Sequence, residues 1–382
     1  MSRRIVVAMS GGVDSSVAAA LLVEQGWEVV GVTLQVWPPG FHPPGRHTGC
    51  CSLDAVDDAR RVADRLGIPY YVFNFQELFA EAVIGPFTRE YLQGRTPNPC
   101  VWCNERVKFG ALLDRALELG AEAVATGHYA AVEFCPERGR WLLKKARDRR
   151  KDQTYALWPL TQAQLARVRF PLAGYTKEEV RALARRFGLP VAAKAESQEI
   201  CFVPDDYRRF LLQTAPEALA PGPIVDTGGK VLGQHPGVAF FTVGQRRGLG
   251  VAFGRPMYVV ELDAASRTVV VGGREEVMAQ GLVAGQANWI ALERLAAPQQ
   301  AAARIRRSAD EVGCVVEPEA AAGDDGSRVR VHFDSPQWAV TPGQSVVFYQ
   351  GDVVLGGAVI ERAVRATAEQ GARQGHTTSA RA

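Results

Sequence analysis

The sequence lacks both an apolar run long enough to cross a bilayer and the pattern of a secretory signal peptide. Net charge is small, at +3 for 382 residues, so global charge does not select a polyanionic partner. Basic residues are instead grouped locally, and each group fits a patch for a polyanion or a solvated surface equally well; the groups are residues 138–151, Arg246-Arg247 and Arg304/Arg306/Arg307. We expect a cytoplasmic protein.

Cysteine is scarce, with seven residues, and without export signals these thiols should stay reduced. Function or metal binding therefore explains them better than structural disulfides. Cys50 and Cys51 follow His47 in a Pro/Gly/His loop with no second pair nearby, so we expect no metal there. Cys135 and Cys314 lie outside any motif and are expected to be buried structural thiols.

The glycine-rich stretch near the start, SGGVDSS at residues 10–16, has no lysine, which excludes the GxxxxGK[ST] loop. The apolar residues Ile5–Met9 predict a buried strand before it, and an Ala/Leu-rich helix follows to about Gln25. Glycine permits close backbone approach, and the free amides and dipole of a helix start favour negative charge. We predict a phosphate-binding loop; the alternative is a turn without a ligand.

Strand and helix patterns alternate up to about residue 206, which predicts an α/β domain with a doubly wound parallel sheet over residues 1–206. We expect strands at 28–36, 70–75 and 121–126, and helices at 53–66, 77–93, 105–119 and 176–187. Ligands bind at the carboxyl ends of such strands, where SGGVDSS, Leu34 and Gly127 fall.

The later part of the chain has a different pattern. Residues 207–281 are rich in proline, glycine and short β-like runs such as VAFFTV at 238–243, and we expect a small β-rich middle domain. Alternating patterns predict a C-terminal antiparallel β-barrel over residues 282–365. Residues 366–382 are small and polar and are expected to form a disordered tail.

SGGVDSS resembles the pyrophosphate loop of the N-type ATP pyrophosphatases, which split ATP between the α and β phosphates. Two further motifs are RTPNPCVWCN at 95–104 and AESQEICF at 195–202. Together the three motifs resemble the bacterial tRNA-specific 2-thiouridylases, which convert the wobble uridine of certain tRNAs to 2-thiouridine. The resemblance extends over roughly residues 3–362 and includes GHY at 127–129, FTVGQRRGLG at 241–250 and the Pro342-Gly343-Gln344 turn.

The resemblance implies a tRNA-uridine 2-sulfurtransferase that uses ATP to transfer AMP to the uracil O2 before sulphur replaces it. Asp14 could hold Mg²⁺, because that ion favours hard oxygen ligands. The nucleotide-binding residues that the resemblance implies are Ala8, Met9, Ser10, Gly11, Gly12, Val13, Asp14, Ser15, Leu34 and Gly127.

Thiolates are suited to carry sulphur as persulfides. The resemblance implies Cys201 as the persulfide carrier and Cys103 as the partner nucleophile, which would form a disulfide with it. The chain departs from the family at Cys100, where an aspartate is often found, and this puts an acid/base role there in doubt. Cys100, Cys103 and Cys201 could alternatively ligate a [4Fe–4S] cluster that delivers hydrosulfide. A redox dithiol or a zinc half-site also fits CxxC.

The resemblance also implies that tRNA is a partner, with the target base splayed out of its stack. The target-base segment would be Asn98, Pro99 and Cys100. The other implied tRNA contacts are His128, Lys151, Asp152, Gln153, Arg306, Arg307 and Gln344. The match is looser at Arg307, and a buried structural histidine also fits His128. For Trp37 and Trp102, core packing is a better interpretation than base stacking.

We further expect a sulphur-donor protein, such as a cysteine desulfurase or a relay protein, as a partner, no membrane contact, and a monomer. Two rival functions remain. An adenylating enzyme acting on a small metabolite would need neither the cysteine pair nor the barrel. A non-catalytic RNA-binding protein that uses CxxC for a metal would not need SGGVDSS.

Overall fold

The computed structural model describes residues 3–37, 53–195, 200–203, 206–251, 254–319 and 327–365. The predictions for Cys50, Cys51 and the tail at 366–382 therefore lie outside the described residues. The first sheet is parallel, with the strand order β3-β2-β1-β4-β7. Its strands are β1 (Arg4–Ala8), β2 (Glu28–Gln35), β3 (Tyr70–Asn74), β4 (Ala123–Ala125) and β7 (Val168–Arg169). This confirms the predicted doubly wound sheet.

Both faces of this sheet are buried at the central strand β1, whereas the edge strand β3 is largely exposed. Successive residues of a strand point to opposite faces, so Ile5 and Val7 join a cluster that includes Val180 of α8 (Lys177–Arg186). Val6 joins a different cluster, which includes Phe87 of α4 (Gly85–Leu92). Helices α1 (Val13–Glu24) and α2 (Leu53–Leu66) belong to the first cluster. The apolar run of β1 is thus explained by cores on both sides.

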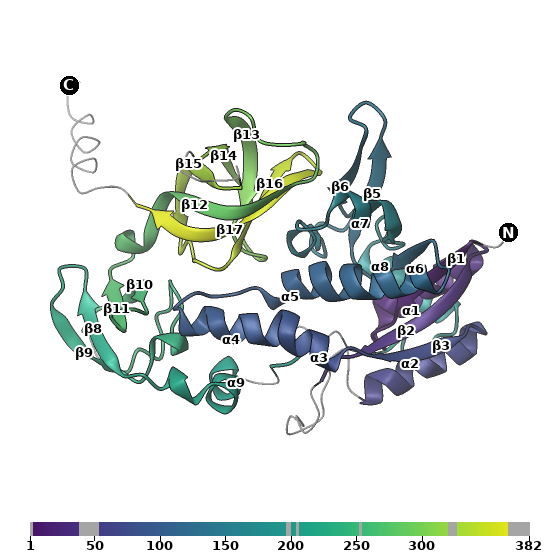
Figure 1. Cartoon of the computed structure of the whole chain (residues 1–382), viewed down its shortest axis with the longest axis horizontal. Coiled ribbons are helices and arrows are strands. Elements are labelled where there is room, and N and C mark those ends of the chain that lie inside the picture. The colour runs from purple at the N-terminus through teal and green to yellow at the C-terminus, as the bar shows by residue number, and fades with distance from the viewer. Residues whose placement is uncertain are drawn as a thin grey trace.

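Two long helical segments contribute to the second cluster (Figure 1). One consists of α3 (Gln76–Phe79), the π-helical η1 (Ala80–Ile84) and α4. The other consists of α5 (Pro99–Trp102), the π-helical η2 (Cys103–Ala111) and α6 (Leu112–Glu118). The helix predicted at 105–119 therefore begins earlier, at Pro99. Proline suits a first helical position, because its φ is already helical and its missing N–H is not needed there.

The middle sheet has the order β10-β11-β8-β9. Its strands are β8 (Gly222–Asp226), β9 (Val231–His235), β10 (Tyr258–Asp263) and β11 (Thr268–Gly272), and α9 (Tyr207–Thr214) precedes them. VAFFTV is not a strand, which corrects the sequence prediction: Val238–Phe240 form a short 3₁₀ helix, η5. These residues are buried, and a short buried apolar run has the same sequence signal in either structure.

The C-terminal strands close into an antiparallel barrel, as predicted. The described strands are β12 (Met278–Trp289), β13 (Gln299–Arg304), β14 (Val312–Pro318), β15 (Val329–Trp338), β16 (Ser345–Gln350) and β17 (Val353–Val364). β12 pairs with both β15 and β17, and this second pairing closes the barrel. The expected domain boundary at residue 281 falls within β12.

A hairpin from the N-terminal part of the chain extends the barrel sheet. It consists of β5 (Ala130–Cys135) and β6 (Arg140–Lys145), and β6 pairs with β17 between Lys144 and Val353 (Figure 1). The sequence pattern does not predict this hairpin, because the alternation of β6 is broken by Leu142 and Leu143 and residues 138–151 indicate only a basic group. Cys135 corrects a second prediction: it is partly exposed, and its Sγ donates to Glu137 at 3.1 Å.

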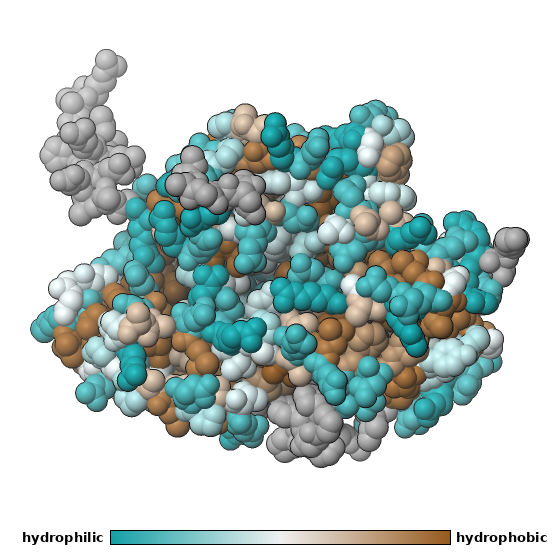
Figure 2. Space-filling view, viewed as in Figure 1, coloured by the Kyte–Doolittle hydropathy of each residue, from teal (hydrophilic) through white to brown (hydrophobic). Residues whose placement is uncertain are grey.

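The visible surface is mostly hydrophilic, with hydrophobic residues scattered among polar ones (Figure 2). Among the described residues, no helix has the length and apolar content needed to cross a membrane. Cys314 is buried as predicted, and burial raises the pKa of its thiol to about 12. Trp37 and Trp102 both pack against the hydrophobic core.

Candidate active site

The loop between β1 and α1 turns so sharply that its backbone requires glycine. Gly11 has a φ of 65°, in the left-handed region that other residues rarely adopt. A Cβ there would lie 2.2 Å from the carbonyl oxygen of Ala55 in α2. Gly12 is the N-cap of α1, and no side chain in the described parts of the chain caps that start. The helix start therefore has the character of an anion site.

Hydroxyl groups hold this loop in one conformation. Ser15 Oγ accepts a hydrogen bond from the Ser10 amide at 3.1 Å and donates to the Gly12 carbonyl at 3.3 Å. Ser16 Oγ donates to the same carbonyl at 2.8 Å. Both hydroxyls belong to buried residues. The loop is thus formed before a ligand binds, which reduces the cost of ordering it.

The ends of several strands meet at this loop. β1 pairs with β2 on one side and β4 on the other, so the chain order changes direction across β1. Open α/β sheets bind ligands at such a switch point. A Cβ on Gly127, after β4, would lie 2.5 Å from the Ser15 amide nitrogen. Leu34 is buried near the end of β2. Gly127 therefore lies against the loop, and nucleotide binding there stays a prediction.

Asp14 contacts two groups that the sequence analysis missed. Lys177 Nζ lies 2.7 Å from Asp14 Oδ1 and 2.9 Å from Oδ2. The Tyr129 hydroxyl donates to Asp14 Oδ1 at 2.9 Å. Lys177 is the first residue of α8. The motif Thr176-x-x-Glu179 predicts where α8 begins, but nothing in the sequence indicates what its first side chain faces.

A second lysine that the sequence analysis missed ties the loop to α2. Lys194 Nζ donates to the Gly11 carbonyl at 3.0 Å and to Asp58 at 2.7 Å. This ammonium therefore stabilises the strained turn at Gly11 through the backbone. The two lysines come from α8 and from the segment that follows it, so only the tertiary fold brings them to the loop.

The contacts of Asp14 bear on the predicted Mg²⁺. The ion takes oxygen ligands and demands near-octahedral geometry. Asp14 offers one carboxylate, and its oxygens already contact an ammonium and a hydroxyl. No group of three or more His, Cys, Asp or Glu side chains suited to a metal occurs among the described residues. Mg²⁺ usually binds through one or two carboxylates together with water and substrate phosphates, so the single carboxylate of Asp14 leaves Mg²⁺ a prediction.

The CxxC motif begins a helix. Asn98 is the N-cap and Pro99 the first residue of α5. Cys100 is exposed, and Cys103 is partly exposed. Cys103 is also the first residue of the π-helical stretch η2. Such geometry is rare in proteins, and where it occurs it is often at a functional site. The motif thus combines an exposed and a partly exposed thiol on the first turns of a helix.

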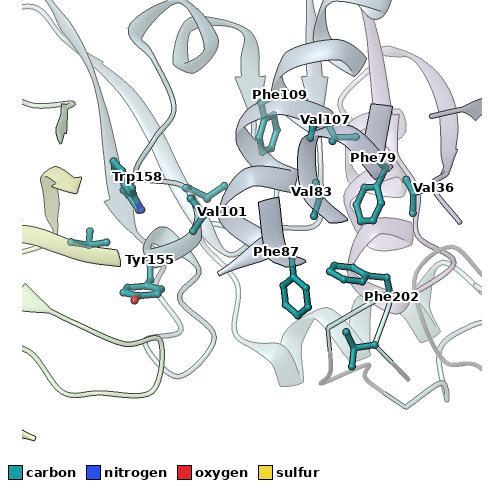
Figure 3. Packing of buried hydrophobic residues seen from close by; sticks show 14 of the residues in the cluster. Val36, Phe79, Val83, Phe87, Val101, Val107, Phe109, Tyr155, Trp158 and Phe202 are labelled. Atoms are coloured by element: carbon teal, nitrogen blue, oxygen red, sulfur yellow. The ribbon is translucent and has the colours of Figure 1, made fainter. Parts of the chain in front are cut away.

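Cys201 is positioned by its neighbour Phe202. The Phe202 ring makes edge contacts with Phe79 at 5.6 Å and Phe87 at 5.1 Å between centroids, and Figure 3 shows the three rings grouped together. Cys201 is partly exposed and packs against the same hydrophobic cluster as Cys103. Cys103 and Cys201 therefore both pack against one hydrophobic core.

The described residues do not form the ligand set of an iron–sulfur cluster. Three thiolates would have to converge on it. Among the residues with described positions, Cys100, Cys103 and Cys201 are not grouped as a metal site. Residues 196–199, which precede Cys201 in its motif, lie outside the described residues.

Asp152 and Gln153 have structural contacts. Asp152 is buried, accepts from the Thr154 hydroxyl at 2.6 Å, and lies 3.4 Å from Arg304 of the barrel. Burial raises the pKa of its carboxyl, and these partners oppose that shift. Gln153 Oε1 accepts from the Tyr129 amide at 2.9 Å. Both side chains therefore connect parts of the protein, while Lys151 beside them is partly exposed.

His128 is buried, and its ring lies 5.9 Å from the rings of both Phe109 and Phe170. Its Nδ1 lies 2.5 Å from the Thr126 hydroxyl. Burial, and then the charge of Lys108, hold the pKa of His128 well below its usual value. The geometry therefore supports the structural interpretation of His128.

The predicted tRNA residues of the barrel differ in exposure. Arg307 is exposed, whereas Arg306 is partly buried and donates to the Trp338 carbonyl at 2.8 Å. Gln344 Nε2 donates to the carbonyls of Thr96, at 2.9 Å, and Pro97, at 3.2 Å. Gln344 thus joins the barrel to the residues just before the predicted target-base segment.

Arginines in the basic group at 138–151 have partners inside the chain. Their ion pairs are Arg147–Glu179 at 3.0 Å, Arg149–Asp352 at 2.6 Å and Arg150–Glu178 at 3.6 Å. Exposed pairs of this kind contribute only about 0–1 kcal/mol each. The free-energy cost of replacing one of these carboxylates with an RNA phosphate would therefore be small.

Three family models match consecutive parts of the chain. They are described as "tRNA methyl transferase HUP domain" over residues 3–205, "tRNA methyl transferase PRC-barrel domain" over 208–273, and "Aminomethyltransferase beta-barrel domain" over 279–360.

Curated relatives match nearly the whole chain. The tRNA-specific 2-thiouridylase MnmA of Symbiobacterium thermophilum is 55% identical, over 95% of this chain and 93% of its own. That of Moorella thermoacetica is 55% identical over 93% and 99%, and that of Acetivibrio thermocellus is 52% identical over 94% and 99%. The family models carry a methyltransferase name, but the relatives, which match across all three regions, carry a 2-thiouridylase name. The chain therefore belongs to the tRNA-specific 2-thiouridylase family.

Proposed function

We propose that this protein catalyses the ATP-dependent 2-thiolation of the wobble uridine of tRNA, as a tRNA-uridine 2-sulfurtransferase. One observation supports this most directly. A glycine-dependent loop at the switch point of the sheet and two partly exposed cysteines on a shared core lie in the same N-terminal domain. A phosphate loop and paired thiols are the two parts that activation by ATP and transfer of sulphur require.

The first step activates the base. The uracil O2 attacks the α-phosphorus of ATP, and the bond from that phosphorus to the bridging oxygen breaks. Pyrophosphate leaves with the electron pair, and the N3 proton of the base is released. The loop at residues 10–16 and the uncapped start of α1 suit the departing anion. Gly127 and Leu34 border the same edge of the sheet.

The second step replaces oxygen by sulphur. The terminal sulphur of a Cys201 persulfide attacks C2, and the C2–O2 bond breaks with release of AMP. The Cys103 thiolate then attacks Sγ of Cys201, which forms a disulfide between the two residues and leaves the outer sulphur on C2. Two thiolates are oxidised and the transferred sulphur is reduced, so electrons balance. A cellular thiol reductant restores the cysteines.

We propose the persulfide route because it needs two thiols, and the two partly exposed thiols of Cys103 and Cys201 pack against one hydrophobic cluster. Sulphur would come from a donor protein, such as a cysteine desulfurase or a relay protein, onto partly exposed Cys201. We propose a cytoplasmic monomer that contacts tRNA through Asn98–Cys100, Lys151, Arg307 and Gln344, with His128, Asp152, Gln153 and Arg306 shaping the surface behind them.

The test measures pyrophosphate release and 2-thiouridine formation with ATP, tRNA and a sulphur donor. Cys201→Ser should keep tRNA-dependent pyrophosphate release and lose thiolation, because its hydroxyl cannot carry a persulfide. Cys135→Ser is the matched control, since that thiol is also partly exposed but lies on the hairpin. Pyrophosphate release that does not need tRNA would indicate a small-metabolite enzyme. A Cys201→Ser variant that still makes 2-thiouridine would overturn the persulfide route.

A further inference from the structure

The loop at residues 10–16 has no lysine of its own, yet a buried ammonium lies beside it. Lys177 Nζ contacts both oxygens of Asp14, in the first turn of α1, at 2.7 and 2.9 Å. The side chain of Lys177 is only 8% exposed, whereas that of Asp14 is 32% exposed. The cation is therefore buried, and the carboxylate that pairs with it is partly exposed.

The position of this lysine is strongly determined. Thr176 and Glu179 form a reciprocal capping box at the start of α8. The backbone amide of Lys177 also donates to the buried carboxylate of Asp148 at 3.1 Å. Three contacts therefore define the backbone from which the ammonium extends. A buried ammonium is costly unless it is paired, and Asp14 supplies the pairing charge while no anion is bound.

We propose that Lys177 is the phosphate-binding lysine of this loop. It neutralises Asp14 in the nucleotide-free protein and contacts the β and γ phosphates when ATP binds. The lysine stem is flexible, so a short movement of Nζ transfers its charge from the carboxylate to an anion at the start of α1. The inference rests on the proposed use of ATP. Lys194 differs, because its ammonium binds the Gly11 carbonyl and Asp58.

The test compares binding of pyrophosphate, ATP and AMP to the full-length protein by calorimetry. Lys177→Met should weaken pyrophosphate and ATP binding at least tenfold and leave AMP binding within twofold, because AMP lacks the phosphates that the ammonium contacts. Lys177→Arg keeps the charge and should recover most of the affinity. Lys144→Met is the matched control, since Lys144 forms an exposed ion pair with Glu133 on the hairpin.

Each other outcome is decisive. If Lys177→Met binds pyrophosphate as tightly as the native protein, Lys177 is not a phosphate ligand. If the variant loses affinity for ATP and AMP equally, with a lower melting temperature, Lys177 only supports the structure and the inference fails. If the native protein binds neither ATP nor pyrophosphate while it remains folded, the proposed function fails instead.

Discussion

Gly127 and His128 both follow β4, but they contact different parts of the protein. Gly127 lets the backbone after β4 approach the first turn of α1, where any Cβ would clash with main-chain atoms. His128 turns into the core between Phe109 and Phe170. The glycine thereby shapes the candidate nucleotide site, and the histidine packs the same turn against the hydrophobic core.

Burial of neutral His128 makes stability depend on pH. Its pKa is lowered in the folded protein, so below about pH 6.5 the unfolded chain binds a proton that the folded protein does not bind. Stability from this residue is complete above that pH and falls as the pH decreases, by up to about 1.4 kcal/mol per pH unit. We expect His128→Gln to reduce this dependence. Urea unfolding of both proteins between pH 5 and 8 checks it, and equal slopes would contradict the assignment.

The start of helix α8 contacts the loop at residues 10–16. Its capping box places Lys177 at the first helical position, opposite Asp14. Helix α7 (Gln162–Arg167) has an equivalent capping box formed by Thr161 and Gln164. The described residues therefore include two similar helix starts, and the start of α8 contacts the candidate site.

This pair allows a matched prediction. Thr176→Ala and Thr161→Ala should each lower the free energy of unfolding by about 1 kcal/mol, because each removes one N-cap. Only Thr176→Ala should also weaken ATP binding, several-fold, because it loosens the backbone that holds Lys177. Chemical unfolding and calorimetric ATP titration measure the two effects. Equal ATP affinities in the two variants would show that the start of α8 does not contribute to nucleotide binding.

At the scale of the whole molecule, the barrel is hydrogen-bonded to the segment just before α5, the helix that carries Cys100 (here the cysteine helix). The Thr96 amide donates to the Pro342 carbonyl at 2.8 Å, and Gln344 donates back to Thr96 and Pro97. The Thr96 hydroxyl lies 3.3 Å from that of Thr242 in the middle region. Residues of all three regions thus meet just before Cys100.

We expect Gln344→Glu to weaken this junction, because it replaces an amide donor with a carboxylate that faces two carbonyls. Leaving buried polar groups unpaired costs about 1–3 kcal/mol, so the melting temperature should fall. Thiolation should decrease more than ATP binding, since the cysteine helix lies nearer to the junction than the phosphate loop does in sequence. Gln337→Glu on the exposed barrel surface is the control. An unchanged melting temperature for Gln344→Glu would rule out the junction.

Sequence patterns predicted the elements with strong local signals. The strand before SGGVDSS, the helix at 53–66 and the capped start of α8 were found close to their observed limits. Residues 130–145 were missed because a short basic hairpin depends on pairing with a strand far along the chain. The strand prediction for VAFFTV was wrong, because a buried apolar run does not distinguish a strand from a 3₁₀ turn.

The sequence by itself determined the fold class, the family and the positions of the glycine-rich loop at residues 10–16 and of the cysteine motifs, because these depend on local patterns and motif order. Only the tertiary structure decided that His128 is buried, that Gln344 binds the 96–97 backbone, and that Lys177 faces Asp14. Such contacts join residues far apart in the chain. Their distances depend on how the sheet, helices and barrel pack, and local periodicity does not specify that packing.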